Sequence, residues 1–116
     1  MTFAPGSQLE KIGPGCFRRT RMKRIAIPKG VEEIPDRAFD GCETLREATF
    51  EEGSRLKTIG NDAFHKCHSL TAIRLPGGLK SVGESAFYEC KNLWSVQFPE
   101  GLERLGGRCF RFTRLK

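Results

Sequence analysis

The chain has 116 residues, of which 38% are hydrophobic and 29% are charged, a composition typical of one small, soluble globular domain. Its apolar runs are only a few residues long, which excludes a transmembrane helix, and residues 1–6 lack the basic and apolar regions of a secretory signal. The net charge of +6 is concentrated in residues 1–30 and 104–116, whereas residues 31–103 carry thirteen acids against eight Lys/Arg, a pattern that argues against a nucleic-acid-binding stripe along the whole chain.

An N-terminal extension, residues 1–8, precedes a sequence that repeats about every 23 residues. The predicted units are 9–30, 31–55, 56–78, 79–101 and a partial unit, 102–116. One phenylalanine recurs in every unit, with steps of 22, 25, 23 and 23 residues along the chain: Phe17, Phe39, Phe64, Phe87 and Phe110. A unit of this size is too small to bury its own apolar face, so the repeat predicts a solenoid in which stacked units share one core.

Within a unit, two local patterns predict different structures. Leu70, Ile73 and Leu75 end in the period-2 alternation of a short strand, which Pro76 then stops. The following Gly-x-x-Ala-Phe-x-x-Cys stretch is interpreted as a tight turn and a short helical segment that directs its Phe inward. The expected fold is therefore an α/β repeat, with a parallel sheet on the concave face and the helical or turn segments on the convex side.

The whole motif, Leu-x-x-Ile-Gly-x-x-Ala-Phe-x-x-Cys-x-x-Leu-x-x-Ile-x-Leu-Pro, resembles the BspA-like or Treponema type of leucine-rich repeat, and the resemblance extends from Leu9 to Leu115. It implies a curved solenoid, and members of this family are often microbial surface proteins that bind other proteins. Two features depart from the family pattern. No secretion signal is visible, and Phe50–Arg55 contain a two-residue insertion that predicts a longer loop. The absent signal predicts an intracellular protein, with the cell surface as the alternative if the sequence belongs to a longer precursor.

The five cysteines recur about once per unit, which favours reduced, buried thiols over a disulfide framework. His65-Lys66-Cys67-His68 invites a zinc interpretation, but Cys67 aligns with other inward cysteines and no second ligand pair is present. No metal, cofactor, nucleophile–base pair or phosphate loop is predicted, so the chain is not expected to be an enzyme.

Alternate strand residues are expected to point outward on the concave face. Tryptophan and arginine are favoured in protein interfaces, and Trp94 is interpreted either as a binding residue or as a cover over its neighbouring strand. The predicted partner-binding residues of the concave face are Lys23, Arg46, Arg74, Trp94 and Gln97.

A second candidate surface is provided by the basic ends. Residues 11–23 and 104–116 are identical at seven of thirteen positions, which indicates either a higher-order repeat or two terminal units shaped for the same kind of contact. Docking of one or both ends against another chain, including end-to-end self-association, is one hypothesis. The candidate residues are Arg18, Arg19, Arg21, Arg24, Arg108, Arg111 and Arg114.

The sequence therefore predicts a protein-interaction or scaffold module with a protein partner and without membrane insertion. The alternative is an RNA-associated subunit that contacts phosphates through its basic ends. The two hypotheses differ in salt dependence, because phosphate contacts release counterions and give a steep dependence of affinity on salt concentration.

Overall fold

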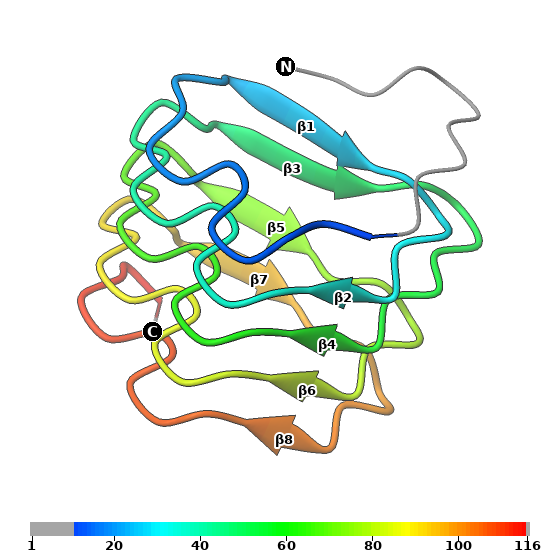
Figure 1. The fold of residues 1–116 in the computed structure, drawn as a ribbon. Helices are drawn as coiled ribbons and strands as arrows, with labels where there is room; N and C mark the ends of the chain where they lie inside the picture. The colour runs from blue at the N-terminus through cyan, green and yellow to red at the C-terminus, as the bar shows by residue number, and fades with distance from the viewer. Residues whose placement is uncertain (1–10, 116) are drawn as a thin grey trace.

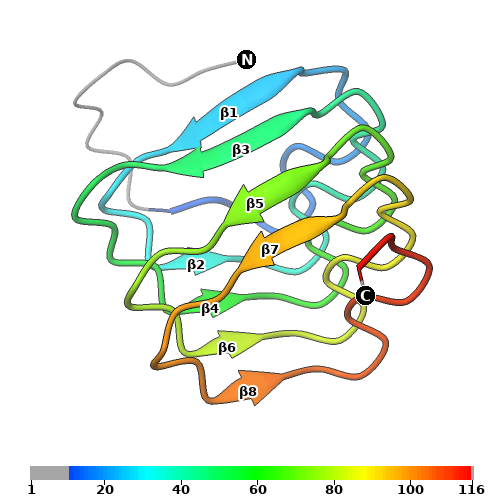
Figure 2. The same cartoon turned by 180° about the vertical axis from the view of Figure 1, so that it is seen from behind.

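The fold is a stack of three-sided coils, described by a computed structural model for residues 11–115 (Figures 1 and 2). A long strand, a short strand and a run of turns form the three sides of a coil, and each kind of side forms one row along the stack. Coils are numbered 1 to 5 by the phenylalanine on their turn side: Phe17, Phe39, Phe64, Phe87 and Phe110. The long strands are β1 (Arg24–Ile27), β3 (Glu47–Phe50), β5 (Ala72–Arg74) and β7 (Ser95–Gln97), and the short strands are β2 (Glu33–Ile34), β4 (Thr58–Ile59), β6 (Ser81–Val82) and β8 (Arg104–Leu105).

The long strands confirm the predicted parallel pairing and also show where it is interrupted. β1 pairs with β3 and β5 pairs with β7, in the register that the repeat predicts, with Arg24 opposite Glu47 and Arg74 opposite Gln97. No ladder joins β3 to β5 within the described residues, so this row consists of two two-stranded sheets. The interruption coincides with the connection 51–57, which is longer than its equivalents 28–32, 75–80 and 98–103, as the insertion predicts.

The short strands form a second parallel sheet, with the order β2-β4-β6-β8, that the sequence does not predict. Two residues are too few to produce a recognisable alternation. Backbone N–H groups of Gly60, Gly83 and Gly106 extend the ladder by donating to the preceding coil over 2.7–2.8 Å. Pro35 occupies the equivalent position in coil 2 and has no N–H to donate, which is consistent with β2 being the first strand of this sheet.

The turn side contains no helix in any of the described coils, so the prediction of short helical segments is wrong. Its N–H groups alternate between two kinds of acceptor, whereas an α-helix needs every N–H to reach the carbonyl four residues back. In coil 2, Ala38 and Asp40 donate to carbonyls three residues back, but Phe39 and Gly41 donate to Ala63 and His65 of coil 3. Left-handed backbone at Arg37 (φ 62°) and Gly41 (φ 73°) directs the alternate N–H groups along the stack. Residues 11–115 accordingly contain no helix that could cross a membrane.

The core confirms the phenylalanine column. Successive rings from Phe17 to Phe110 stack with centroid separations of 5.1–5.4 Å and interplanar angles of 3–12°. Phe39, Phe64 and Phe87 are completely buried. Because the separation matches the spacing of adjacent strands, each ring lies one coil above the last, and the column is continuous through the molecule.

Four of the five cysteines are buried, as predicted, and all five are free thiols. The thiols of Cys42, Cys67 and Cys90 donate to the carbonyls of Phe17, Phe39 and Phe64 in the preceding coil over 3.0–3.3 Å. Burial raises the pKa of the Cys67 thiol well above its ordinary value of 9.0 and raises the pKa of Cys109 to about 11. Cys16 is exposed, so the prediction of burial is wrong for it, because its coil has no preceding coil among the described residues.

A thiol-reactive dye at about pH 8 is therefore expected to label one site per folded chain rapidly, namely Cys16. The buried thiols are expected to react only after unfolding, because the dye cannot reach them in the folded chain. The raised pKa values of Cys67 and Cys109 also predict that the contribution of these two thiols to stability is constant below pH 9.0 and is lost as the pH rises through about 11, since the unfolded thiols deprotonate first. Rapid labelling that persists in Cys16→Ser would contradict this expectation.

Candidate protein-binding surfaces

The outward face of the four long strands is the most extensive candidate surface, and it is called the long-strand face below. All five residues that the sequence places on it are exposed: Lys23, Arg46, Arg74, Trp94 and Gln97. The Trp94 side chain is 64% exposed, so it covers little of its neighbouring strand. Arg74 Nε donates to Gln97 Oε1 over 3.0 Å, which fixes both side chains across the β5–β7 pair. The face therefore combines an exposed aromatic ring with pre-positioned polar groups.

A shallow groove crosses the long-strand face where the ladder is interrupted. It has a volume of about 350 Å³ and is lined from both sides of the interruption, by Glu47, Thr49 and Phe50 of β3 and by Ala72 and Arg74 of β5. Gln97 of β7 closes one side. The groove brings Arg74 and Gln97 together with side chains of β3 that the sequence does not assign to a site.

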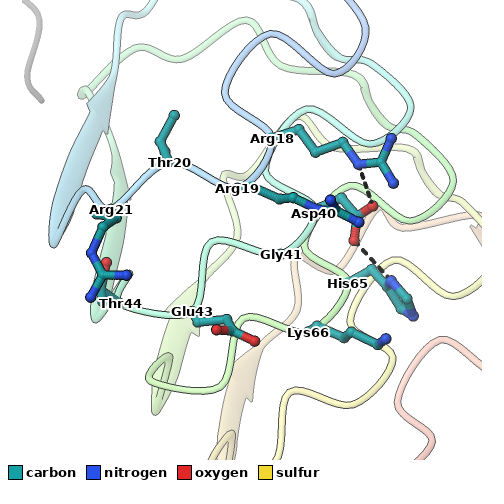
Figure 3. Close-up of a pocket in the computed structure, with 10 residues that line it drawn as sticks. All are labelled: Arg18, Arg19, Thr20, Arg21, Asp40, Gly41, Glu43, Thr44, His65 and Lys66. Atoms are coloured by element: carbon teal, nitrogen blue, oxygen red, sulfur yellow. Dashed lines mark hydrogen bonds and ion pairs between the residues drawn. The ribbon is translucent and has the colours of Figure 1, made fainter.

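A second hollow lies on the turn side and is called the basic cleft below (Figure 3). It has a volume of about 400 Å³. Figure 3 shows Arg18 and His65 bound to different oxygens of Asp40; Arg18 Nε is 3.0 Å from Oδ2, and His65 Nδ1 is 2.9 Å from Oδ1. The lining residues come from three successive coils: Arg18, Arg19, Thr20, Arg21, Asp40, Gly41, Glu43, Thr44, His65 and Lys66.

Gly41 lines the cleft with its backbone and lets the Arg19 side chain pack closely over it. The equivalent positions of coils 1 and 3 are Arg19 and Lys66, two residues after their phenylalanines, and all three residues have left-handed backbone. A Cβ atom on Gly41 would lie 3.1 Å from Arg19 Cγ. The Arg19 side chain therefore lies over Gly41 and occupies the space that a Cβ atom there would need.

The basic residues predicted at the two ends of the chain do not converge on one site. Arg18, Arg19 and Arg21 line the basic cleft, whereas Arg24 lies on the long-strand face opposite Glu47. The other three belong to coil 5, where the Arg111 guanidinium lies 5.1 Å from the ring centroid of Phe112: Arg108, Arg111 and Arg114. Four coil spacings of 5.1–5.4 Å separate the phenylalanines of coils 1 and 5.

Comparison with known protein families shows which family has this architecture. The family model described as BspA type leucine-rich repeat region (6 copies) matches residues 10–116. The chain belongs to the BspA-type leucine-rich repeat family. The resemblance of the sequence motif is thereby confirmed for nearly the whole chain.

Solved leucine-rich repeat structures share the solenoid of this BspA-type chain. A leucine-rich repeat protein of T. pallidum is 31% identical with a TM-score of 0.87, covering 97% of this chain and 52% of its own. A leucine-rich repeat protein from Bacteroides ovatus is also 31% identical, with a TM-score of 0.72, covering 78% of this chain and 23% of its own. The pneumococcal vaccine antigen PcpA is 26% identical with a TM-score of 0.69, covering 81% of this chain and 29% of its own. This chain thus spans about half the length of the T. pallidum protein and less than a third of the length of the other two. A search of curated proteins found no match.

The BspA-type repeat also generates a ladder of surface side chains that sequence analysis missed. Asp40, His65 and Tyr88 each follow the phenylalanine of their coil, so they are stacked in one column beginning at Arg18. Beyond the ion pairs, the His65 ring lies 5.2 Å from Tyr88, and the Tyr88 ring lies 5.5 Å from Phe112. Sequence analysis could have found this ladder by aligning the residues that immediately follow the column phenylalanines, because these residues recur with the same period.

The histidine-rich segment does not form a metal cluster in the described residues. Cys67 points inward, as the column predicts, and its thiol is bound to the Phe39 carbonyl. His65 is bound to Asp40, and His68 Nδ1 is 3.7 Å from Glu43 Oε2. No three His, Cys, Asp or Glu side chains in residues 11–115 are grouped to hold a metal ion.

Apart from Trp94, the exposed large apolar side chains of the described stack are two in coil 5 and Phe98, which follows the long strand of coil 4. Phe98 is 46% exposed, Leu105 is 49% exposed and Phe112 is 55% exposed. The Phe110 ring of the same coil is only partly buried. Apolar surface is thus concentrated at this end of the stack, whereas Ile12 and Phe17 of coil 1 are buried.

Proposed function

We propose that this BspA-type chain is a protein-interaction module that binds its partner through the long-strand face. The carrying observation is that the four long strands present one outward face, crossed by a groove between β3 and β5, on which Trp94 is 64% exposed. Stacked repeats hold such a surface rigid, so few degrees of freedom are lost on binding. Trp94 and Arg74 supply the large contact area and directional hydrogen bonding that dominate protein interfaces.

A triple variant, Arg46→Ala, Arg74→Ala and Trp94→Ala, is expected to weaken partner binding by roughly 30-fold or more, since a single interface hot spot contributes about 2 kcal/mol. All three side chains are exposed, so the circular dichroism spectrum is expected to be unchanged. The partner is isolated from native lysate with the tagged wild-type chain, identified by mass spectrometry and then titrated against each purified variant.

The matched control changes three exposed basic residues away from the face: Lys29→Ala, Arg55→Ala and Lys80→Ala. It lowers the net charge by three and is expected to retain binding within about twofold, because exposed charges contribute little individually. An equal loss of partner binding in the face variant and in the control variant would contradict a specific role of the long-strand face. Loss of the captured partner on nuclease treatment would instead favour the RNA-associated alternative.

A further inference from the structure

We propose that the basic cleft binds the carboxylates of an acidic segment of the protein partner, with Arg19, Arg21 and Lys66 as the binding cations. This inference rests on the proposed function and names the chemistry of the partner at a second site. It commits to a peptide rich in Asp and Glu. Nucleic acid and phosphate are the competing ligands that the experiment below distinguishes.

The charge of the cleft favours two monoanionic groups. Four Lys/Arg side chains line it against the two carboxylates of Asp40 and Glu43, which leaves a net charge of +2. Within the described residues, only Arg18 of these four cations has a carboxylate within 4.0 Å. Asp40 is therefore already bound, and Arg19, Arg21 and Lys66 remain to pair with carboxylates from outside.

The cleft is also preorganised to receive such groups. The Asp40 side chain is only 11% exposed and is held by both Arg18 and His65, so the floor of the cleft is fixed. The Arg19 side chain packs over Gly41, since a Cβ atom there would lie 3.1 Å from Arg19 Cγ. Arg19 and Lys66 therefore line one cleft beside a fixed Asp40–Arg18 pair, and an incoming carboxylate does not have to displace an existing ion pair of either cation.

Nucleic acid fits the cleft less well than carboxylates do. Binding to single strands depends on exposed aromatic rings that stack on bases, and the only ring in the lining is that of His65, which already packs against Tyr88. A phosphomonoester such as phosphoserine carries about −1.5 to −2 charges where a carboxylate carries one, so Asp40 and Glu43 would repel it more strongly. The charge balance and the absence of a stacking platform in the lining both favour an acidic peptide.

The cleft is continuous with the long-strand face. Thr44 Oγ1 donates to the Met22 carbonyl over 2.9 Å, and the Arg46 N–H donates to the Lys23 carbonyl over 2.8 Å. Arg21 of the cleft is two residues before Lys23 of the face, so the two surfaces adjoin along coil 1. An acidic segment that leaves the cleft would next meet Lys23 and Arg46.

The test uses a fluorescently labelled hexaglutamate peptide as probe, with affinity measured by fluorescence polarisation at low and moderate salt. The cleft variant, Arg19→Ala, Arg21→Ala and Lys66→Ala, is expected to bind roughly tenfold or more weakly than the wild type. The control with three equal charge losses is Lys29→Ala, Arg55→Ala and Lys80→Ala, and it is expected to stay within about twofold. Gly41→Asn tolerates left-handed backbone and does not change the charge, but its Cβ atom would lie 3.1 Å from Arg19 Cγ and displace that side chain, so it is also expected to weaken binding.

Amide NMR spectra of the ¹⁵N-labelled chain give a second readout. Addition of hexaglutamate is expected to shift the Gly41 and Lys66 amide signals more than the Trp94 indole signal. Equal losses in the cleft and control variants, or shifts spread over all basic regions, would overturn the proposal. Tighter cleft-dependent binding of a phosphoserine peptide or of a six-nucleotide RNA would also overturn it. Each of these outcomes leaves the long-strand-face test unaffected, because that test depends on Arg46, Arg74 and Trp94.

Discussion

Replacement of Phe64 by alanine is expected to lower the free energy of unfolding by about 3–5 kcal/mol. Phe64 is completely buried, and its ring stacks between Phe39 at 5.1 Å and Phe87 at 5.2 Å. The substitution removes both ring contacts and leaves a cavity in the middle of the column, where the coils above and below limit collapse. Since small domains are stable by only about 5–15 kcal/mol, urea denaturation should show a clear decrease in the transition midpoint.

The same substitution at Phe110 provides the matched control. Phe110 belongs to the same column but is only partly buried and has one stacking neighbour, Phe87, at 5.4 Å. Phe110→Ala is therefore expected to cost less than half as much as Phe64→Ala. Similar losses at both positions would mean that the continuous ring column is not the main source of stability at Phe64.

Replacement of Gly83 by alanine is expected to cost about 3 kcal/mol, the upper part of the range for overpacking. A Cβ atom there would lie 2.5 Å from Asn61 Oδ1, 2.7 Å from Asn61 N and 2.7 Å from the Gly60 carbonyl carbon. Two of these atoms belong to the backbone of the preceding coil, so the clash can be relieved only by separating the coils. That separation would also weaken the hydrogen bond from Gly83 N to Ile59 O, now 2.7 Å.

Gly77→Ala is the control for this second substitution. Its Cβ atom would meet nothing within 4 Å, and the residue does not need left-handed backbone. Its thermal midpoint is therefore expected to stay close to that of the wild type, whereas Gly83→Ala should fall by roughly 10 °C or more. If both variants melted together, close approach of the coils at Gly83 would not be limiting.

The periodicity of the sequence was sufficient to predict most of the core. Stacking moves each coil by one strand spacing, so residues one period apart must share a column. This principle correctly placed Phe39, Phe64 and Phe87 in the core and Trp94 on the surface. It also predicted the register between Arg74 and Gln97, because a parallel ladder between coils preserves the repeat.

The same reasoning failed where hydrogen bonds between coils determine the local backbone. The turn-side pattern resembles a short helix, but Phe39 N and Gly41 N donate to coil 3 and are therefore lost to a helix. The short strands escaped prediction because their ladder depends on the close approach of the coils at residues such as Gly83. Neither the hydrogen bonds between coils nor the close approach of the coils can be recognised from the residues of a single repeat unit.

One candidate site could be predicted from the sequence and the other could not. The residues of the long-strand face were predictable, because residues one period apart share an outward column. Strand alternation itself applies to Arg74 and Gln97, whereas Lys23, Arg46 and Trp94 each lie one residue before a strand. The basic run Arg18, Arg19 and Arg21 was visible in the sequence, but its relation to Lys66 was not, since the cleft forms only when three successive coils are stacked.

The sequence by itself determined the repeat, the columns that fill the core, the family and the outward residues of the long strands. These properties follow from a fixed period, because the period alone assigns each residue to a column and each column to the inside or outside. Only the tertiary structure decided the second sheet, the turns in place of helices, the interruption between β3 and β5, and the basic cleft. These features depend on distances and hydrogen bonds between neighbouring coils, which bring together residues more than twenty positions apart.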